Sequence, residues 1–242
     1  MGRKSNEKFH IHPNRIIVYF WRRNSSVIFI VPLIHTIRIA DTTVLGIWQV
    51  TESAADMLTS LRISSIDRAL INTYKNETRK KQVLACRMIL SHFLNPRELQ
   101  LEYDEFGKPF LKNRNEFISL SHSGMVSAAI INGQGPAGID IEIIRDRIGR
   151  VSDRFLTKAE LAGIDPEHRL EWLYVCWCGK EALYKLYGKP EVDLKNDILI
   201  HSFDYFCTGK GSCWATLTTP EYTREFELYY EKLGEYMFVY TY

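Results

Sequence analysis

Apolar residues recur at intervals of three and four between Pro166 and Gly188, which is the period of one face of an α-helix. Proline suits the first turn of a helix and glycine suits its end, so the pattern predicts a helix over residues 166–187. The apolar stripe of this helix consists of Leu170, Leu173, Tyr174, Trp177 and Tyr184.

One carboxylate, Glu181, falls on this stripe between Trp177 and Tyr184, and Lys185 lies one turn further along, at the edge of the stripe. A carboxylate packed among aromatic rings either takes up a proton or needs a cation or strong hydrogen-bond donors, because its desolvation costs roughly several kcal/mol. Alternatively, Glu181 and Lys185 form an ordinary pair on a solvated face, worth about 0.2–0.5 kcal/mol. The helix alone leaves both interpretations open.

The stretch GPAGIDIEII, residues 135–144, predicts a strand that is entered from a turn rich in glycine and proline. Asp140 and Glu142 then share one face of this strand, and the neighbouring isoleucines share the other. An exposed strand face would explain these two acids. Together with Glu181, however, they supply three hard oxygen ligands, which suits Mg²⁺. The combination favours a metal site.

Helical and strand patterns follow each other in the same order twice along the chain. A helical stretch over 66–94 precedes four strand patterns, and the helix over 166–187 precedes four more. This order predicts an α+β fold of two similar halves, residues 31–134 and 135–242, in a pseudo-twofold arrangement with the active site in the cleft between them. The expected strands cover residues 99–103, 109–111, 117–121 and 126–132 in the first half, and 197–207, 213–218, 224–231 and 236–242 in the second.

Residues 1–30 differ from the rest of the chain in charge. They hold six Lys or Arg residues and one acid, so the remainder carries 25 basic and 28 acidic residues. Their apolar runs IIVYFW and VIFIV are too short to span a bilayer, and no small-residue cleavage site follows them. We therefore expect a basic extension outside the core.

Composition narrows the class of protein. A chain of 242 residues with 45% hydrophobic content is long enough to bury a core in one or two domains. The near-neutral body favours neither nucleic-acid binding nor stable membrane association. Five cysteines have the spacing of neither a zinc site nor a disulfide framework, so we expect reduced, buried thiols. This agrees with the cytoplasmic location that we expect, but composition alone does not point to it.

Two motifs, GIDIE at 138–142 and WCGKEALYK at 177–185, resemble the paired signature of 4'-phosphopantetheinyl transferases in residues and in spacing. That signature reads Gly-x-Asp-x-Glu, followed by Trp-x-x-Lys-Glu-Ala-x-x-Lys. The length and layout resemble the long, monomeric, surfactin-synthetase-activating members of the family rather than the half-size trimeric ones. Four further segments follow the order of the family: ETRKKQVLACR (77–87), FGKPFL (106–111), SLSHSG (119–124) and RFLTKAE (154–160).

The resemblance implies a reaction and its partners. Such holo-[acyl-carrier-protein] synthases use Mg²⁺ to transfer the 4'-phosphopantetheine arm of coenzyme A to a serine of an apo acyl or peptidyl carrier protein. Adenosine 3',5'-bisphosphate is released. Carriers of fatty-acid, polyketide and peptide synthesis all fit this description, so the partner stays open among them.

The resemblance also assigns roles to the charged residues of the second half. Asp140, Glu142 and Glu181 would bind Mg²⁺ against the pyrophosphate of coenzyme A, and Lys185 would contact a pyrophosphate oxygen. Lys180 would do the same or form a salt bridge at the rim of the cleft.

In the first half, Lys108, Ser121 and His122 would contact the 3'-phosphate of coenzyme A, and Arg79 and Arg87 would support the nucleotide. The contribution of His122 would grow below about pH 6.5, where an imidazole is charged.

The resemblance leaves the general base open between Glu160 and Glu181. Two other classes of protein also fit clustered acids. A metal-dependent phosphodiester nuclease usually keeps its last acid and lysine close together on a strand, whereas Glu181 and Lys185 lie a helical turn apart. A carrier-binding module without activity is disfavoured because all three candidate metal ligands are present.

Overall fold

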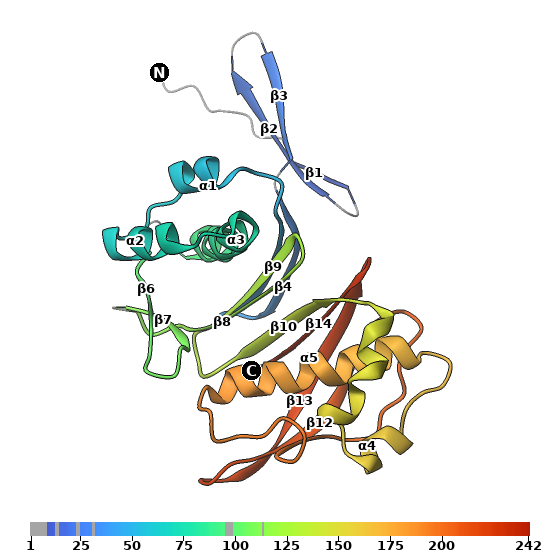
Figure 1. The fold of residues 1–242 in the computed structure, drawn as a ribbon. Coiled ribbons are helices and arrows are strands. Elements are labelled where there is room, and N and C mark those ends of the chain that lie inside the picture. Colours follow the sequence, from blue (N-terminus) through green and yellow to red (C-terminus); the bar gives the residue numbers. More distant parts are fainter. Residues whose placement is uncertain (1–8, 13–14, 23–24, 31, 95–98, 113) are drawn as a thin grey trace.

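The chain folds into helices and antiparallel sheets, which confirms the predicted α+β class. Figure 1 shows two bodies, each with one long helix packed on a sheet. The pseudo-twofold relation between them stays a prediction. The computed structural model describes residues 9–12, 15–22, 25–30, 32–94, 99–112 and 114–242.

The N-terminal half is built on a four-stranded antiparallel sheet, which consists of β4 (Leu33–Ala40), β5 (Thr43–Gln49), β8 (Phe117–Ser123) and β9 (Val126–Asn132). The strand order is β4-β5-β9-β8, which leaves β8 at one edge. β8 and β9 confirm the strands expected there. β4 and β5 had no predicted counterpart.

Helices α1 (Ala54–Ser60), α2 (Ser65–Thr73) and α3 (Glu77–Phe93) lie on one side of this sheet (Figure 1). The sequence predicted one helix over 66–94, but the chain breaks it after α2. Asn76 begins α3, where its side chain accepts a hydrogen bond from the backbone N–H of Arg79 at 2.9 Å. A two-stranded sheet of β6 (Leu101–Tyr103) and β7 (Pro109–Leu111) follows.

The C-terminal half is built on a five-stranded antiparallel sheet, which consists of β10 (Gly138–Ile143), β11 (Ile198–Ile200), β12 (Lys210–Thr218), β13 (Thr223–Leu233) and β14 (Tyr236–Thr241). The order β10-β14-β13-β12-β11 puts β10 at an edge. The strand expected over 197–207 is shorter because the segment after β11 bonds to side chains. The backbone N–H of Phe206, for example, donates to the hydroxyl of Tyr230 at 3.1 Å.

Helix α5 (Arg169–Tyr187) packs on β10 and β14. It begins three residues after Pro166, because Asp165 first accepts the backbone N–H of Glu167 at 2.9 Å in a turn. It ends at Gly188, whose φ of 79° is left-handed, as expected of a helix-terminating glycine. Short helical turns η1 (Asp146–Arg150) and η2 (Ser152–Arg154) and helix α4 (Lys158–Ala162) connect β10 to α5.

The N-terminal segment forms a separate antiparallel sheet of β1 (Phe9–His12), β2 (Arg15–Arg22) and β3 (Ser25–Ile30). In Figure 1 the β2–β3 hairpin points away from both halves. The expectation that residues 1–30 lie outside the core stays a prediction.

Each half has its own apolar core, and a third apolar cluster joins the two sheets. This cluster combines side chains of β5 and β9 with side chains of β10 and β14, so the halves share buried surface rather than a linker alone. Its members include Leu45, Ile47, Ala128, Ile130, Ile139, Ile141, Phe238 and Tyr240.

All five cysteines are free thiols; four of them are buried and Cys207 is exposed. The expectation of reduced thiols is thus met, with one exception to their burial. Among the described residues, no helix is long and apolar enough to cross a membrane.

Gly138 at the start of β10 carries the close packing of this strand against α5. A Cβ atom there would overlap the backbone carbonyl of Ala182, with its carbon 2.7 Å away. We expect Gly138→Ala to lower the free energy of unfolding by about 1–3 kcal/mol or more, because a backbone carbonyl within a helix cannot move aside. Chemical denaturation measures this loss. Gly135→Ala is the matched control, since a Cβ there meets nothing within 4 Å. Equal stability of the two variants would contradict this packing.

Candidate active site

The edges of the two sheets meet where β8 lies beside β10, and serine hydroxyls join them. Ser119, Ser121 and Ser123 accept the backbone N–H groups of Ile139, Ile141 and Ile143 at 3.1, 3.2 and 3.2 Å. We call these three residues of β8 the serine row. It satisfies the outward amides of β10 in place of a neighbouring strand.

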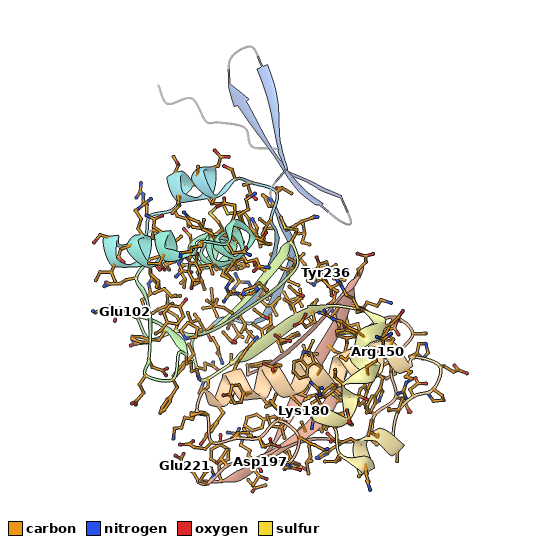
Figure 2. All side chains as sticks on the ribbon, in the orientation of Figure 1. Glu102, Arg150, Lys180, Asp197, Glu221 and Tyr236 are labelled. Carbon is orange, nitrogen blue, oxygen red and sulfur yellow. The ribbon has the colours of Figure 1, made fainter. Side chains whose placement is uncertain are left out.

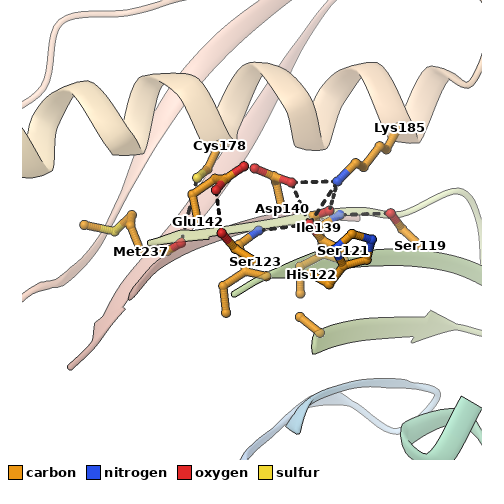
Figure 3. Close-up of polar contacts among 12 residues, drawn as sticks. Ser119, Ser121, His122, Ser123, Ile139, Asp140, Glu142, Cys178, Lys185 and Met237 are labelled. Atoms are coloured by element: carbon orange, nitrogen blue, oxygen red, sulfur yellow. Dashed lines mark hydrogen bonds and ion pairs between the residues drawn. The ribbon is translucent and has the colours of Figure 1, made fainter. Parts of the chain in front are cut away.

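Asp140 on β10 is the most enclosed acid at this junction, with 4% of its surface exposed. Its Oδ1 accepts hydrogen bonds from the hydroxyl of Ser121 at 2.7 Å and from the ammonium of Lys185 at 2.6 Å. Its Oδ2 is buried and has no hydrogen-bond partner among the described residues. Figure 3 shows the carboxylate between β10 and α5, with Lys185 reaching it from the helix.

Glu142 and Glu181 extend this negative cluster. Glu142 accepts a hydrogen bond from the hydroxyl of Ser123 at 2.6 Å through its Oε2. Burial raises the pKa of Glu142, and the charge of Asp140 adds to that rise. Burial likewise raises the pKa of Glu181, with Asp140 next in importance. The carboxylate on the helix stripe therefore faces the two strand acids, and the solvated Glu-to-Lys pair does not describe it.

The donor set fits a hard divalent cation. Three carboxylates converge on one junction, and the buried, unpartnered Oδ2 of Asp140 lacks the donor or cation that such an oxygen requires. Among the described residues, however, no group of three or more His, Cys, Asp or Glu side chains is already assembled around one metal position. Asp140 is thus the preformed part of the site.

Cationic and imidazole groups lie beside the acids. A nitrogen of the Arg79 guanidinium lies 3.2 Å from Nδ1 of His122; because guanidinium only donates, Nδ1 is the acceptor and the imidazole proton sits on Nε2. Burial lowers the pKa of His122 to about 4, and the charges of Arg79 and Lys185 contribute. Burial thus keeps this imidazole neutral in the free protein below pH 6.5, and the expected growth of its phosphate contact below that pH stays a prediction.

Lys108 of the N-terminal half lies near Lys185. A cavity of about 220 Å³ has both lysines in its lining, together with Phe106, Leu120 and Tyr184. The ammonium of Lys108 donates to the carbonyl of Leu186 near the end of α5 at 2.6 Å, and burial lowers the pKa of Lys108. Lys108 thus lines the junction, but it contacts α5 rather than His122.

The structure places Lys180 and Glu160 away from the junction. Lys180 forms a salt bridge, the alternative to a pyrophosphate contact, but inside the C-terminal half rather than at the rim of the cleft. The role of Glu160 as one of two candidate bases stays a prediction. Lys180 is fully buried, and its ammonium contacts Oε1 of Glu160 at 2.8 Å and donates to the carbonyl of Leu194 at 3.0 Å. Glu160 also closes the capping box of α4 with Thr157. Figure 2 shows Lys180 inside the C-terminal half. With its donors used, Lys180 joins elements within that half.

Arg87 likewise differs from its expected role at the nucleotide. It is 1% exposed and forms a bidentate pair with Asp67, through Nε to Oδ2 at 2.7 Å and Nη2 to Oδ1 at 2.5 Å. Its remaining nitrogen donates to the carbonyl of Val83 at 3.0 Å. The pair ties α2 to α3.

Sequence reasoning missed Ser119 and Ser123, and it gave Ser121 a phosphate contact. The structure instead gives all three serines bonds to β10. Their alternation in SLSHS was a visible signal, because residues two apart on a strand share a face.

Fold and junction together define an α+β protein whose two halves meet at a cluster of carboxylates edged by cations. Residues 136–239 match the model of the 4'-phosphopantetheinyl transferase superfamily. The chain is 31% identical to 4'-phosphopantetheinyl transferase AcpT of Salmonella typhi over 137 residues, which are 54% of this chain and 71% of that protein. The chain belongs to the 4'-phosphopantetheinyl transferase superfamily, as the two signature motifs predicted.

Other relatives match over shorter regions. Identity to AcpT of Escherichia coli K12 is 35% over 119 residues, or 46% of this chain and 59% of that protein. Identity to a 4'-phosphopantetheinyl transferase of Bacillus subtilis is 27% over 100 residues, or 40% and 44% of the two chains. The match thus spans less than two thirds of these two relatives.

The buried pair of Glu160 and Lys180 generates a stability prediction. Glu160→Ala should lower the free energy of unfolding by about 3–5 kcal/mol, because it leaves the ammonium of Lys180 buried without its charge partner. Denaturant titration measures the change. Lys158→Ala, an exposed change in the same helix, is the control and should stay within about 0.5 kcal/mol. An unperturbed Glu160→Ala protein would contradict the buried pair.

The low pKa of His122 generates a second prediction. In the free protein, nuclear magnetic resonance should show this imidazole titrating near pH 4, and Arg79→Ala should raise the pKa because it removes a neighbouring positive charge. Because the pKa of His122 in the folded protein lies below the ordinary value of 6.5, the imidazole binds its proton more tightly in the unfolded chain. The free energy of unfolding should therefore fall as the pH falls from about 6.5 towards 4. A wild-type pKa near 6.5 would contradict the burial of His122.

Proposed function

We propose that this protein transfers the 4'-phosphopantetheine arm of coenzyme A to a serine of an apo acyl or peptidyl carrier protein. The observation that carries the proposal is the junction of Asp140, Glu142 and Glu181 with Lys185, which lies within the region that matches the family. The relatives from Escherichia coli and Bacillus subtilis bear the name 4'-phosphopantetheinyl transferase.

Mg²⁺ would be held by the three carboxylates, beginning with the unpartnered Oδ2 of Asp140. When bound, such an ion neutralises charge that develops on phosphate oxygens. Lys185 donates to Oδ1 of Asp140 and also lines the neighbouring cavity. Its side chain is 28% exposed, which supports a contact with a pyrophosphate oxygen from the cavity side.

The reaction forms a bond between the serine oxygen of the carrier and the phosphorus that bears the pantetheine arm. The bond from that phosphorus to the bridging oxygen breaks, and adenosine 3',5'-bisphosphate leaves with the electron pair. The serine proton must pass to a base. Glu181 suits this role better than Glu160, since Glu181 lies at the junction whereas Glu160 is enclosed in its pair with Lys180.

Arg79, His122 and Lys108 would bind the nucleotide end of coenzyme A. They come from the N-terminal half and surround the junction with cationic and neutral donors. A phosphate beside His122 would raise the pKa of the imidazole, because a negative charge favours its protonated form. Neutral His122 donates through Nε2 even before that change.

The carrier would dock beside Glu142. A groove of about 360 Å³ opens there, with an apolar floor that includes Phe155 and Trp177. Arg147 and Arg150 also line it and are exposed, which complements an acidic helix next to the modified serine of a carrier.

The test is incubation with coenzyme A, Mg²⁺ and a panel of apo carrier proteins from fatty-acid, polyketide and peptide synthesis, followed by measurement of intact mass. A gain of one phosphopantetheine arm on at least one carrier is the expected result. Asp140→Asn should lower the transfer rate by at least about 100-fold, because the loss of a metal ligand removes several kcal/mol of transition-state stabilisation. Arg147→Glu should raise the KM for the carrier and leave the KM for coenzyme A unchanged.

Lys158→Ala is the matched control, since this exposed side chain lies outside the junction, and it should retain full activity. If the wild type modifies no carrier in the panel, the proposed function is wrong. If Asp140→Asn retains near-normal turnover at saturating Mg²⁺, the metal assignment is wrong.

A further inference from the structure

The serine row makes two kinds of contact, and only some of its members make both. Ser119, Ser121 and Ser123 each accept one backbone N–H group of β10. Ser121 and Ser123 also donate to the carboxylates of Asp140 and Glu142, at 2.7 and 2.6 Å. For Ser119, the described residues show no bond to a carboxylate. Ser119 can therefore be compared with Ser121 and Ser123, because it shares their contact with β10 but not their contact with an acid.

The hydrogen bond that a serine oxygen accepts from a backbone N–H of β10 limits where its own hydroxyl proton can point. A serine hydroxyl has one proton and two lone pairs, and a backbone N–H of β10 occupies one lone pair. At Ser121 the ammonium of Lys185, 3.1 Å from Oγ, occupies the other. The single proton is left for the carboxylate, so each acid is tied through one hydroxyl to the backbone of its own strand.

Each hydroxyl occupies only one oxygen of its carboxylate. Ser121 and Lys185 both bond to Oδ1 of Asp140, which leaves the buried Oδ2 without a partner. Ser123 bonds to Oε2 of Glu142. A carboxylate held by one oxygen presents the other in a fixed direction, which is how residues behind metal ligands orient them.

We propose that Ser121 and Ser123 are positioning residues that orient Asp140 and Glu142 towards a divalent cation, beyond their role in joining the two sheets. The inference rests on the proposed metal-dependent transfer. It assigns Ser121 to the carboxylate rather than to a phosphate of coenzyme A. Ser123 gives the cleaner test, because a change at Ser121 also removes a contact of Lys185.

The experiment measures binding of Mn²⁺ alone to the full chain, by electron paramagnetic resonance of the free ion. Ser123→Ala should raise the dissociation constant about 10-fold or more, the usual effect of losing a partner behind a metal ligand. Ser119→Ala is the matched control, because it also removes a hydrogen bond from a backbone N–H of β10 to the serine row. This variant should bind Mn²⁺ as the wild type does. Ser123→Thr keeps the hydroxyl and should restore affinity.

Thermal unfolding of every variant separates positioning from folding. Should Ser123→Ala fail to fold, Ser123→Cys replaces it, since a thiol of similar size donates only weakly and should still weaken Mn²⁺ binding. Equal losses of affinity in Ser119→Ala and Ser123→Ala would overturn the inference, because the row would then act only as a join between the sheets. Unchanged affinity in Ser123→Ala, or no binding of Mn²⁺ by the wild type, would also overturn it.

Transfer assays keep this inference distinct from the proposed function. In Ser123→Ala, the Mg²⁺ concentration that gives half-maximal transfer should rise about 10-fold, while kcat at saturating Mg²⁺ should change little. If the wild type transfers no arm to any carrier, the proposed function fails, yet the comparison of Mn²⁺ binding still decides whether the serines position the acids.

Discussion

The structure depends on how the exposed edge of β10 is satisfied. An edge strand presents backbone N–H groups that are costly to bury without partners. In this chain β10 is covered by β8, and hydroxyls of the serine row accept its amides instead of backbone carbonyls. The two sheets therefore meet without merging into one. Two of the same hydroxyls also donate to Asp140 and Glu142 of β10, so the join between the sheets is part of the candidate active site.

The charged residues divide into those that hold each half together and those at the junction. Arg87 with Asp67, and Lys180 with Glu160, are buried pairs within a single half, and their cations also donate to backbone carbonyls. Lys185 is different, because it contacts Asp140 and remains partly exposed. Breaking a buried pair leaves a charge without compensation, so the first group is suited to specifying packing and the second to meeting a ligand.

The sequence predicted the elements whose pattern is local. Strong periodicity located α5 and β9, and left-handed Gly188 ended the helix as expected. The break between α2 and α3 escaped because charged residues with good helix propensity, such as Glu77, Arg79 and Lys80, follow it, while the cap at Asn76 is a weak signal. The strands β4 and β5 escaped as well. β4 pairs with β5, and β5 also pairs with β9. The register of these pairs and the burial of their side chains cannot be read from a single stretch of sequence.

The candidate site shows the same limit at the level of single residues. Asp140, Glu142 and Glu181 were predicted together, and the structure brings them to one junction. Lys180 sits next to Glu181 in sequence, yet a helix sends adjacent residues in directions about 100° apart. Glu181 faces β10, whereas Lys180 points into the core of the C-terminal half and contacts Glu160. A motif identifies which residues are present, but the partner of each depends on the face it occupies.

Charged groups of both halves meet at this junction, and apart from Lys185 of α5 the acids and the cations come from different halves. The acids belong to the C-terminal half, while Arg79, Lys108 and His122 belong to the N-terminal half. Burial and, after it, the charge of Asp140 raise the pKa of Glu181, and burial beside cations lowers the pKa of His122, so neither side is fully compensated in the free protein. A cation would relieve the first imbalance, and an anion would relieve the second. A ligand that binds the folded chain but not the unfolded chain stabilises the folded state. A metal ion and a phosphate group bound together would therefore strengthen the contact between the halves.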